Sequence, residues 1–134
     1  MSTEHIQPEG LFDLPGFSQV VKSDRSTSIH IAGQGAFDKD MQLIGAGDYQ
    51  AQATQAFNNL AIALEAAGAK PEDVVSSVMY VVDLNSDSTA AFIAGMGQAL
   101  NGKGFPNNAS SLIGVQSLAM EGMLVEISAV AMID

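Results

Sequence analysis

The chain has no cysteine and no tryptophan, and only five of its 134 residues are lysine or arginine. The lack of cysteine excludes disulfides, thiolate nucleophiles and zinc sites built on sulfur. No apolar run approaches the ~20 residues that a membrane-spanning helix needs. The first residues, Met1–Glu9, lack the basic and apolar regions of a signal peptide, so we expect a soluble cytoplasmic protein.

Acidic residues outnumber basic ones by fifteen to five, which gives a net charge of −10 and an isoelectric point near 4.2. A surface this acidic repels phosphate backbones and anionic lipids. The basic residues are scattered along the chain and form no cluster: Lys22, Arg25, Lys39, Lys70 and Lys103. We therefore expect neither nucleic acid nor a membrane as a partner.

The length and the hydrophobic content together predict one folded domain over residues 1–134. Hydrophobic residues make up 47% of the chain, which is enough to build a core. A domain of this size buries roughly two thirds of the surface that its unfolded chain exposes. No linker, internal repeat or low-complexity segment divides the sequence.

Apolar residues at helical spacing predict two helices. The first covers Asp48–Ala67, with its opening aspartate as the N-cap. The second runs from Asp87 or Ser88 to about Leu100. Its weak point is Gly95-Met-Gly97, because each glycine inside a helix costs ~1 kcal/mol relative to alanine.

Short runs rich in β-branched residues predict six strands. They cover residues 18–21, 26–32, 42–45, 74–82, 111–118 and 123–132. The first two flank the polar turn Lys22–Arg25 and are predicted to pair as a hairpin. The resulting order, βββαβαββ, is typical of an α+β fold whose helices pack on one face of the sheet.

Two segments at a defined separation carry a resemblance to a known family: Ile29-His-Ile-Ala-Gly-Gln-Gly35 and Leu64-Glu-Ala-Ala-Gly-Ala-Lys-Pro-Glu-Asp-Val-Val75. The chain resembles the RidA family, also called YjgF/YER057c/UK114. Further matching segments extend the resemblance over most of the chain: Gly16–Gln19, Gly47-Asp, Gln55–Leu60 and Val125–Ala129. The resemblance implies a chorismate-mutase-like fold with a mixed sheet, a homotrimer, and hydrolysis of small reactive enamines and imines.

The resemblance also implies a cleft between subunits, where an arginine after a Pro-Ala step binds the substrate carboxylate. An arginine suits this task because its planar fork of donors grips a carboxylate bidentately. Here the corresponding segment reads Asn108-Ala-Ser110, and no arginine follows Arg25. Ser110 either forms a hydrogen bond to a different ligand or merely begins a strand. Arg25 either reaches the cleft from another strand or faces solvent in its turn.

Four further residues complete the implied site. The resemblance assigns the hydrolytic water to Glu126, although a glutamate in an alternating strand can also simply face solvent. Phe17 stands where many members have a tyrosine, and Phe92 falls at the position of a polar asparagine. Gly33 keeps the glycine that allows close backbone approach. The implied pocket is therefore more apolar and less cationic than that of a typical member.

The two histidines give no convincing metal site, and no cofactor is implied. His30 alternates with isoleucines in a strand and is expected to be structural, whereas His5 is expected in a mobile N-terminal segment. Three functional hypotheses follow. The chain is a RidA-like enamine or imine deaminase, a non-catalytic trimer that binds a small molecule in the same cleft, or an assembly protein with a vestigial cleft.

Overall fold

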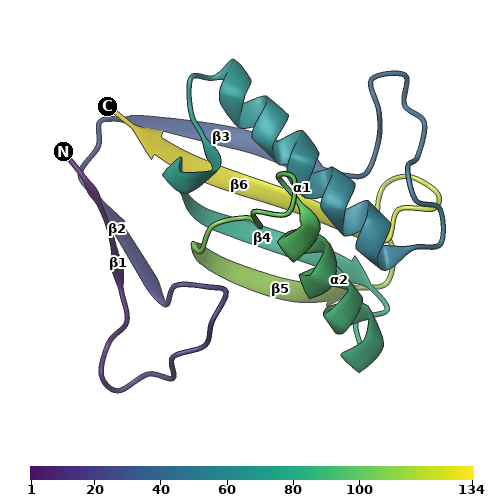
Figure 1. Cartoon of the computed structure of the whole chain (residues 1–134), viewed down its shortest axis with the longest axis horizontal. Helices are drawn as coiled ribbons and strands as arrows, with labels where there is room; N and C mark the ends of the chain where they lie inside the picture. The colour runs from purple at the N-terminus through teal and green to yellow at the C-terminus, as the bar shows by residue number, and fades with distance from the viewer.

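A computed structural model describes all 134 residues (Figure 1). Two helices pack on one face of a mixed four-stranded sheet, so the α+β fold predicted from the sequence is confirmed. The elements in chain order are β1 (Thr3–Ile6), β2 (Val20–Ser23), β3 (Thr27–Gln34), α1 (Tyr49–Ala66), the 3₁₀ turn η1 (Pro71–Asp73), β4 (Val74–Val82), α2 (Ser86–Gln98), β5 (Ala109–Val115) and β6 (Val125–Ile133).

The strands of the main sheet lie in the order β3-β6-β4-β5. β6 pairs antiparallel with both β3 and β4, whereas β4 and β5 run parallel. α2 and the loop after it connect the parallel pair, as a crossover between parallel strands requires. β1 and β2 form a separate antiparallel hairpin that extends from the end of the sheet where both chain termini lie (Figure 1).

The pairing of the N-terminal strands corrects two predictions. The predicted hairpin of residues 18–21 and 26–32 does not form, because β2 pairs with β1 and β3 pairs with β6. Residues 42–45 are not a strand either, and only an isolated bridge joins Phe37 to Leu43. Three strands still precede α1, because β1 forms in an N-terminal segment for which no strand was predicted. The order βββαβαββ is therefore correct, but its first strand is β1 and residues 42–45 contribute none.

The predicted helices form, with small differences at their ends. Asp48 caps α1, since its Oδ1 accepts a hydrogen bond from the Ala51 amide at 3.0 Å. The N-cap of α2 is Asn85 rather than Asp87 or Ser88. Its side-chain oxygen accepts bonds from both of those backbone amides, at 2.9 and 3.0 Å. An asparagine at this position satisfies donors that the first turn leaves free.

The core lies between the helices and the sheet. Alternate residues of β6 are buried under α1: Val125, Ile127, Ala129 and Ala131. Phe57 on α1 packs against Phe92 on α2 and against Phe105, with ring centroids 5.7 and 5.1 Å apart. The opposite face of the sheet carries no helix, so the other half of each strand remains accessible (Figure 1).

Tyr49 joins the start of α1 to the end of β4. Its hydroxyl donates a hydrogen bond to the Val82 carbonyl at 2.7 Å. Burial, and secondarily the carboxylate of Asp83, raise the pKa of this phenol above its usual 10.0. The folded protein therefore keeps the phenol proton at a pH where the unfolded chain has begun to lose it. By linkage, the stability contributed by Tyr49 is present at neutral pH and is lost as the pH rises above about 10.

We expect Tyr49→Phe to lower the free energy of unfolding by about 1 kcal/mol at neutral pH, because the Val82 carbonyl loses its donor. The difference between the two proteins should shrink at alkaline pH, since only the wild type loses stability through this phenol. Urea unfolding at pH 8 and above pH 10 measures both effects. A difference that stays constant or grows with pH would contradict the raised pKa.

Candidate functional site

An apolar cavity of about 260 Å³ lies between α2, the edge of the sheet and the loop before β2. Ten residues line it: Leu14, Pro15, Gly16, Phe17, Met79, Phe92, Ile93, Met96, Ser110 and Leu112. Ser110 is the only polar side chain among them, and none carries a charge. Three of the five predicted site residues, Phe17, Phe92 and Ser110, therefore lie around one cavity.

Each of these three residues is held by a different part of the fold. Phe92 is buried against Phe57, so it forms the inner wall of the cavity and belongs to the core as well. Ser110 lies near the start of β5, where it is the register partner of Ser77 on β4. Phe17 comes from the loop between β1 and β2 and is only half-buried. The loop thus supplies the outer wall.

The other two predicted residues, Gly33 and Glu126, lie together on neighbouring strands β3 and β6. A Cβ atom at Gly33 would collide with the carboxylate of Glu126, so only glycine lets this side chain lie across β3. Tyr80 on β4 is the register partner of Glu126 on its other side. Glu126 therefore lies between a glycine and a tyrosine on the face of the sheet that carries no helix.

The cavity and Glu126 lie on opposite faces of the sheet. Ser110 is level with Ser77 on β4, and Glu126 is level with Tyr80 on the same strand. Because successive side chains of a strand alternate between faces, positions three apart point in opposite directions. A single copy of the chain therefore separates the five predicted residues into two groups, with Phe17, Phe92 and Ser110 in one and Gly33 and Glu126 in the other.

Arg25 does not line the apolar cavity. Its guanidinium donates to Asp73 at 2.8 Å and to the Met132 carbonyl at 3.3 Å. The same Asp73 carboxylate accepts the backbone amide of Lys70 at 2.9 Å. Arg25 thus joins the start of β3 to the 3₁₀ turn before β4, and this structural role leaves the cavity without an arginine.

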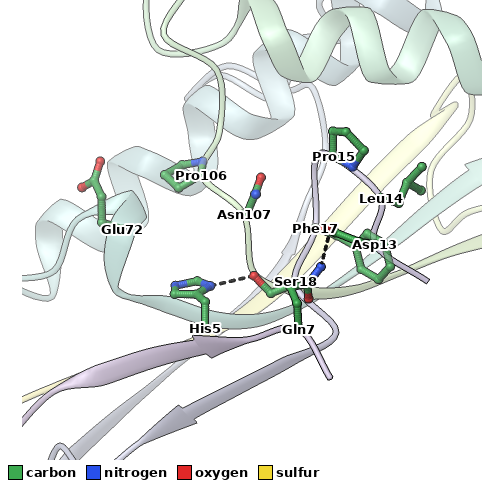
Figure 2. Close-up of a pocket in the computed structure, with 10 residues that line it drawn as sticks. All are labelled: His5, Gln7, Asp13, Leu14, Pro15, Phe17, Ser18, Glu72, Pro106 and Asn107. Atoms are coloured by element: carbon green, nitrogen blue, oxygen red, sulfur yellow. Dashed lines mark hydrogen bonds between the residues drawn. The ribbon is translucent and has the colours of Figure 1, made fainter. Parts of the chain in front are cut away.

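A larger cavity of about 430 Å³ lies on the other side of the loop that carries Phe17 (Figure 2). Its lining includes acidic side chains, Asp13 and Glu72, and an unexpected pair, His5 and Ser18. His5 Nδ1 and Ser18 Oγ are 2.6 Å apart. The expectation of a mobile segment at His5 is wrong, because this residue lies in β1. The strand has only four residues, too few to give a periodic signal.

Neither α1 nor α2 has the length and hydrophobicity that a membrane span requires. No group of three or more histidine and carboxylate side chains is arranged to hold a metal ion. The candidate site therefore consists of the apolar cavity, the Glu126 group and the larger cavity beside Phe17.

Comparison with known proteins supports the family resemblance. Residues 13–133 match a family model described as endoribonuclease L-PSP. A Rid-family protein of unknown function from Yersinia pestis is 36% identical, with 99% of this chain and 100% of that chain covered and a TM-score of 0.88. The chain belongs to the Rid family.

Two other Rid-family structures are more distant. RidA from the Antarctic bacterium Psychrobacter is 30% identical over 97% of this chain and 99% of its own, with a TM-score of 0.67. A YjgF/YER057c/UK114 member from Mycobacterium tuberculosis is 28% identical over 87% of this chain and 86% of its own, with a TM-score of 0.60. A comparison with curated proteins finds no match.

Proposed function

We propose that this Rid-family chain is a deaminase that hydrolyses small, weakly polar imines or enamines. The observation that carries the proposal is the apolar cavity with a single polar side chain, Ser110, at its edge. In the reaction, water adds its oxygen to the C=N carbon, the C–N bond breaks and ammonia leaves. The products are a ketone or aldehyde and ammonia, and no cofactor is needed.

Ser110 is proposed to occupy the place of the family's substrate-binding arginine. A hydroxyl can donate one hydrogen bond and accept two, but it cannot neutralise a carboxylate. Burying an unpaired carboxylate against the methionine, leucine and phenylalanine side chains of this cavity would be costly. The site should therefore prefer imines without a carboxylate, whose apolar side chains fit between Phe17 and Phe92.

Glu126 is proposed to hold the hydrolytic water. Since its carboxylate lies on the face opposite Ser110, the reacting groups can meet only if two copies of the chain contribute. We propose a homotrimer in which the cavity of one copy faces Glu126 and Gly33 of the next. Gly33 would let the substrate approach the backbone of β3 closely, because no side chain covers it there.

A second candidate function is binding without catalysis in the same site. It is favoured by the absence of any charged side chain around the cavity, which leaves little to polarise a C=N bond. The ligand would again be small and weakly polar. Neither candidate involves nucleic acid or a membrane, because the net charge of −10 repels both, and a cytoplasmic location suits a protein that acts on metabolites.

The test is ammonia release from freshly generated imines, with the protein compared with buffer. The panel should pair each imine of an amino acid with the matching imine that lacks the carboxylate. We expect acceleration by the protein, and a higher kcat/KM for the neutral member of each pair. A flat response to every imine would favour the binding function, and a preference for the carboxylates would contradict the role of Ser110.

A further inference from the structure

The pair formed by Ser18 and His5 is not used by the proposed hydrolysis. The Ser18 hydroxyl lies 2.6 Å from His5 Nδ1, and it has no other partner in the protein. Both residues line the larger cavity, whose volume of about 430 Å³ is ample for a small acyl compound. Figure 2 shows the His5 imidazole directed at the Ser18 hydroxyl, with a dashed line between them.

The backbone around Ser18 is fixed. The Ser18 amide donates to the Asn108 carbonyl at 2.9 Å, and the Asn108 side chain accepts the Ser77 hydroxyl at 2.7 Å. All three residues are buried. The serine is therefore held against the main sheet. His5 lies in β1, and Ser18 lies two residues before β2, the strand that pairs with β1.

We propose that Ser18 is a nucleophile that small activated esters or thioesters acylate, with His5 as its general base. A serine hydroxyl is a weak nucleophile until an adjacent base removes its proton. In the first step Ser18 Oγ bonds to the acyl carbon and its proton passes to His5 Nδ1. The alkoxide or thiolate leaving group then departs with that proton, which leaves an acyl-serine and a neutral imidazole.

The charges around the cavity indicate which acyl donors fit. The cavity is lined by the Asp13 and Glu72 carboxylates, and by no lysine or arginine. The same carboxylates repel anionic acyl donors. Neutral donors, and donors with a cationic group, are therefore preferred over carboxylated ones.

The neighbouring backbone amides indicate that acylation of Ser18 is slow. The amide of Ser18 is bonded to Asn108, and the amide of Gln19 donates to the Gln7 side chain at 2.7 Å. Neither is free to stabilise the oxyanion of a tetrahedral intermediate, a contribution that commonly speeds acyl transfer by about 10²–10³. Slow acylation is expected, so a covalent label is a better readout than turnover.

The test uses the intact protein, a fluorophosphonate probe and p-nitrophenyl acetate, with mass spectrometry of peptides to locate the adduct. We expect the label on Ser18, its loss in Ser18→Ala, and a labelling rate at least about 10-fold lower in His5→Gln. Matched controls are Ser86→Ala, on an exposed helical serine, and His30→Gln, on the other histidine. Both should label like the wild type. A label on another residue, or an unchanged rate in His5→Gln, would overturn the proposal.

A second experiment uses the natural lack of cysteine, because any introduced thiol is then unique. Ser18→Cys should react with iodoacetamide at neutral pH about 10-fold faster than the double variant Ser18→Cys/His5→Gln, since the imidazole promotes the thiolate. Both thiols occupy the same position, so their access to the reagent is matched. Equal reactivity of the two proteins would contradict an activated nucleophile at position 18. Neither experiment involves an imine, so the outcome is separate from that of the proposed deaminase function.

Discussion

Gly95→Ala is expected to destabilise the protein by about 2–3 kcal/mol, in the range of overpacked core substitutions. Gly95 lies where α2 crosses α1. A Cβ atom there would be 2.5 Å from the Gln50 carbonyl oxygen and 2.6 Å from the Ala53 methyl group. The Thr54 hydroxyl also donates to the Gly95 carbonyl at 2.9 Å, which fixes the two helices at this distance. The backbone of α1 is packed in the core, so moving it away from a new methyl group costs free energy of folding.

Gly97→Ala is the matched control on the same helix. Outside the backbone of its own helix, nothing lies within 4 Å of a Cβ built at Gly97, so an alanine fits there without a clash. It should stabilise the protein by up to about 1 kcal/mol, because alanine favours a helix over glycine. Thermal unfolding should therefore shift in opposite directions for the two variants, downward by roughly 5–12 °C for Gly95→Ala. Shifts of the same sign would contradict the helix packing described above.

Glu126→Gln is expected to lower kcat for imine hydrolysis by about 100-fold or more, the usual contribution of a general acid–base group. The amide keeps the shape of the carboxylate and its contact with Gly33, but it cannot accept a proton from water. The affinity for the substrate should change little, because the apolar cavity that binds it does not include Glu126 and is left intact by the substitution.

Steady-state kinetics on a neutral imine, with binding measured separately by calorimetry, distinguish the two effects. Glu121→Gln is the control, because Glu121 lies in the exposed turn before β6 and its substitution removes the same charge. Full turnover in Glu126→Gln would show that the carboxylate has no part in the reaction. A loss of affinity with unchanged kcat would make Glu126 a binding residue instead.

Helical periodicity correctly predicted the two helices, whose formation depends on residues close in the sequence. The α1 helix has helical periodicity and an aspartate N-cap, and both survive in the structure. Strand pairing depends on contacts that are distant in sequence, and there the prediction failed. Residues 18–21 were paired with the next strand along the chain, but Val20 of β2 lies opposite Ile6 of β1, fourteen positions earlier. A four-residue strand such as Thr3–Ile6 is too short for its sequence to indicate which strand it pairs with.

The candidate site shows the same division. The family resemblance singled out Phe17, Phe92 and Ser110, and the structure arranges all three around one cavity. Their separation from Glu126 depends on how β4, β5 and β6 are ordered, which the sequence alone does not reveal. The Ser18–His5 pair was missed for a similar reason, because its members lie thirteen positions apart in the sequence. Helix propensity alone makes Gly95 a weak point of α2, but its close contact with α1 requires a residue without a side chain.

The most direct test of the account mixes two inactive variants and measures ammonia release from a neutral imine. Glu126→Gln keeps the cavity and loses the carboxylate, whereas Ser110→Phe fills the cavity and keeps the carboxylate. If each site of a trimer joins the cavity of one copy to Glu126 of the next, equal co-assembly restores about a quarter of the wild-type activity per site. A mixture no more active than its parents, beside an active wild type, would place both groups in one copy and contradict the account.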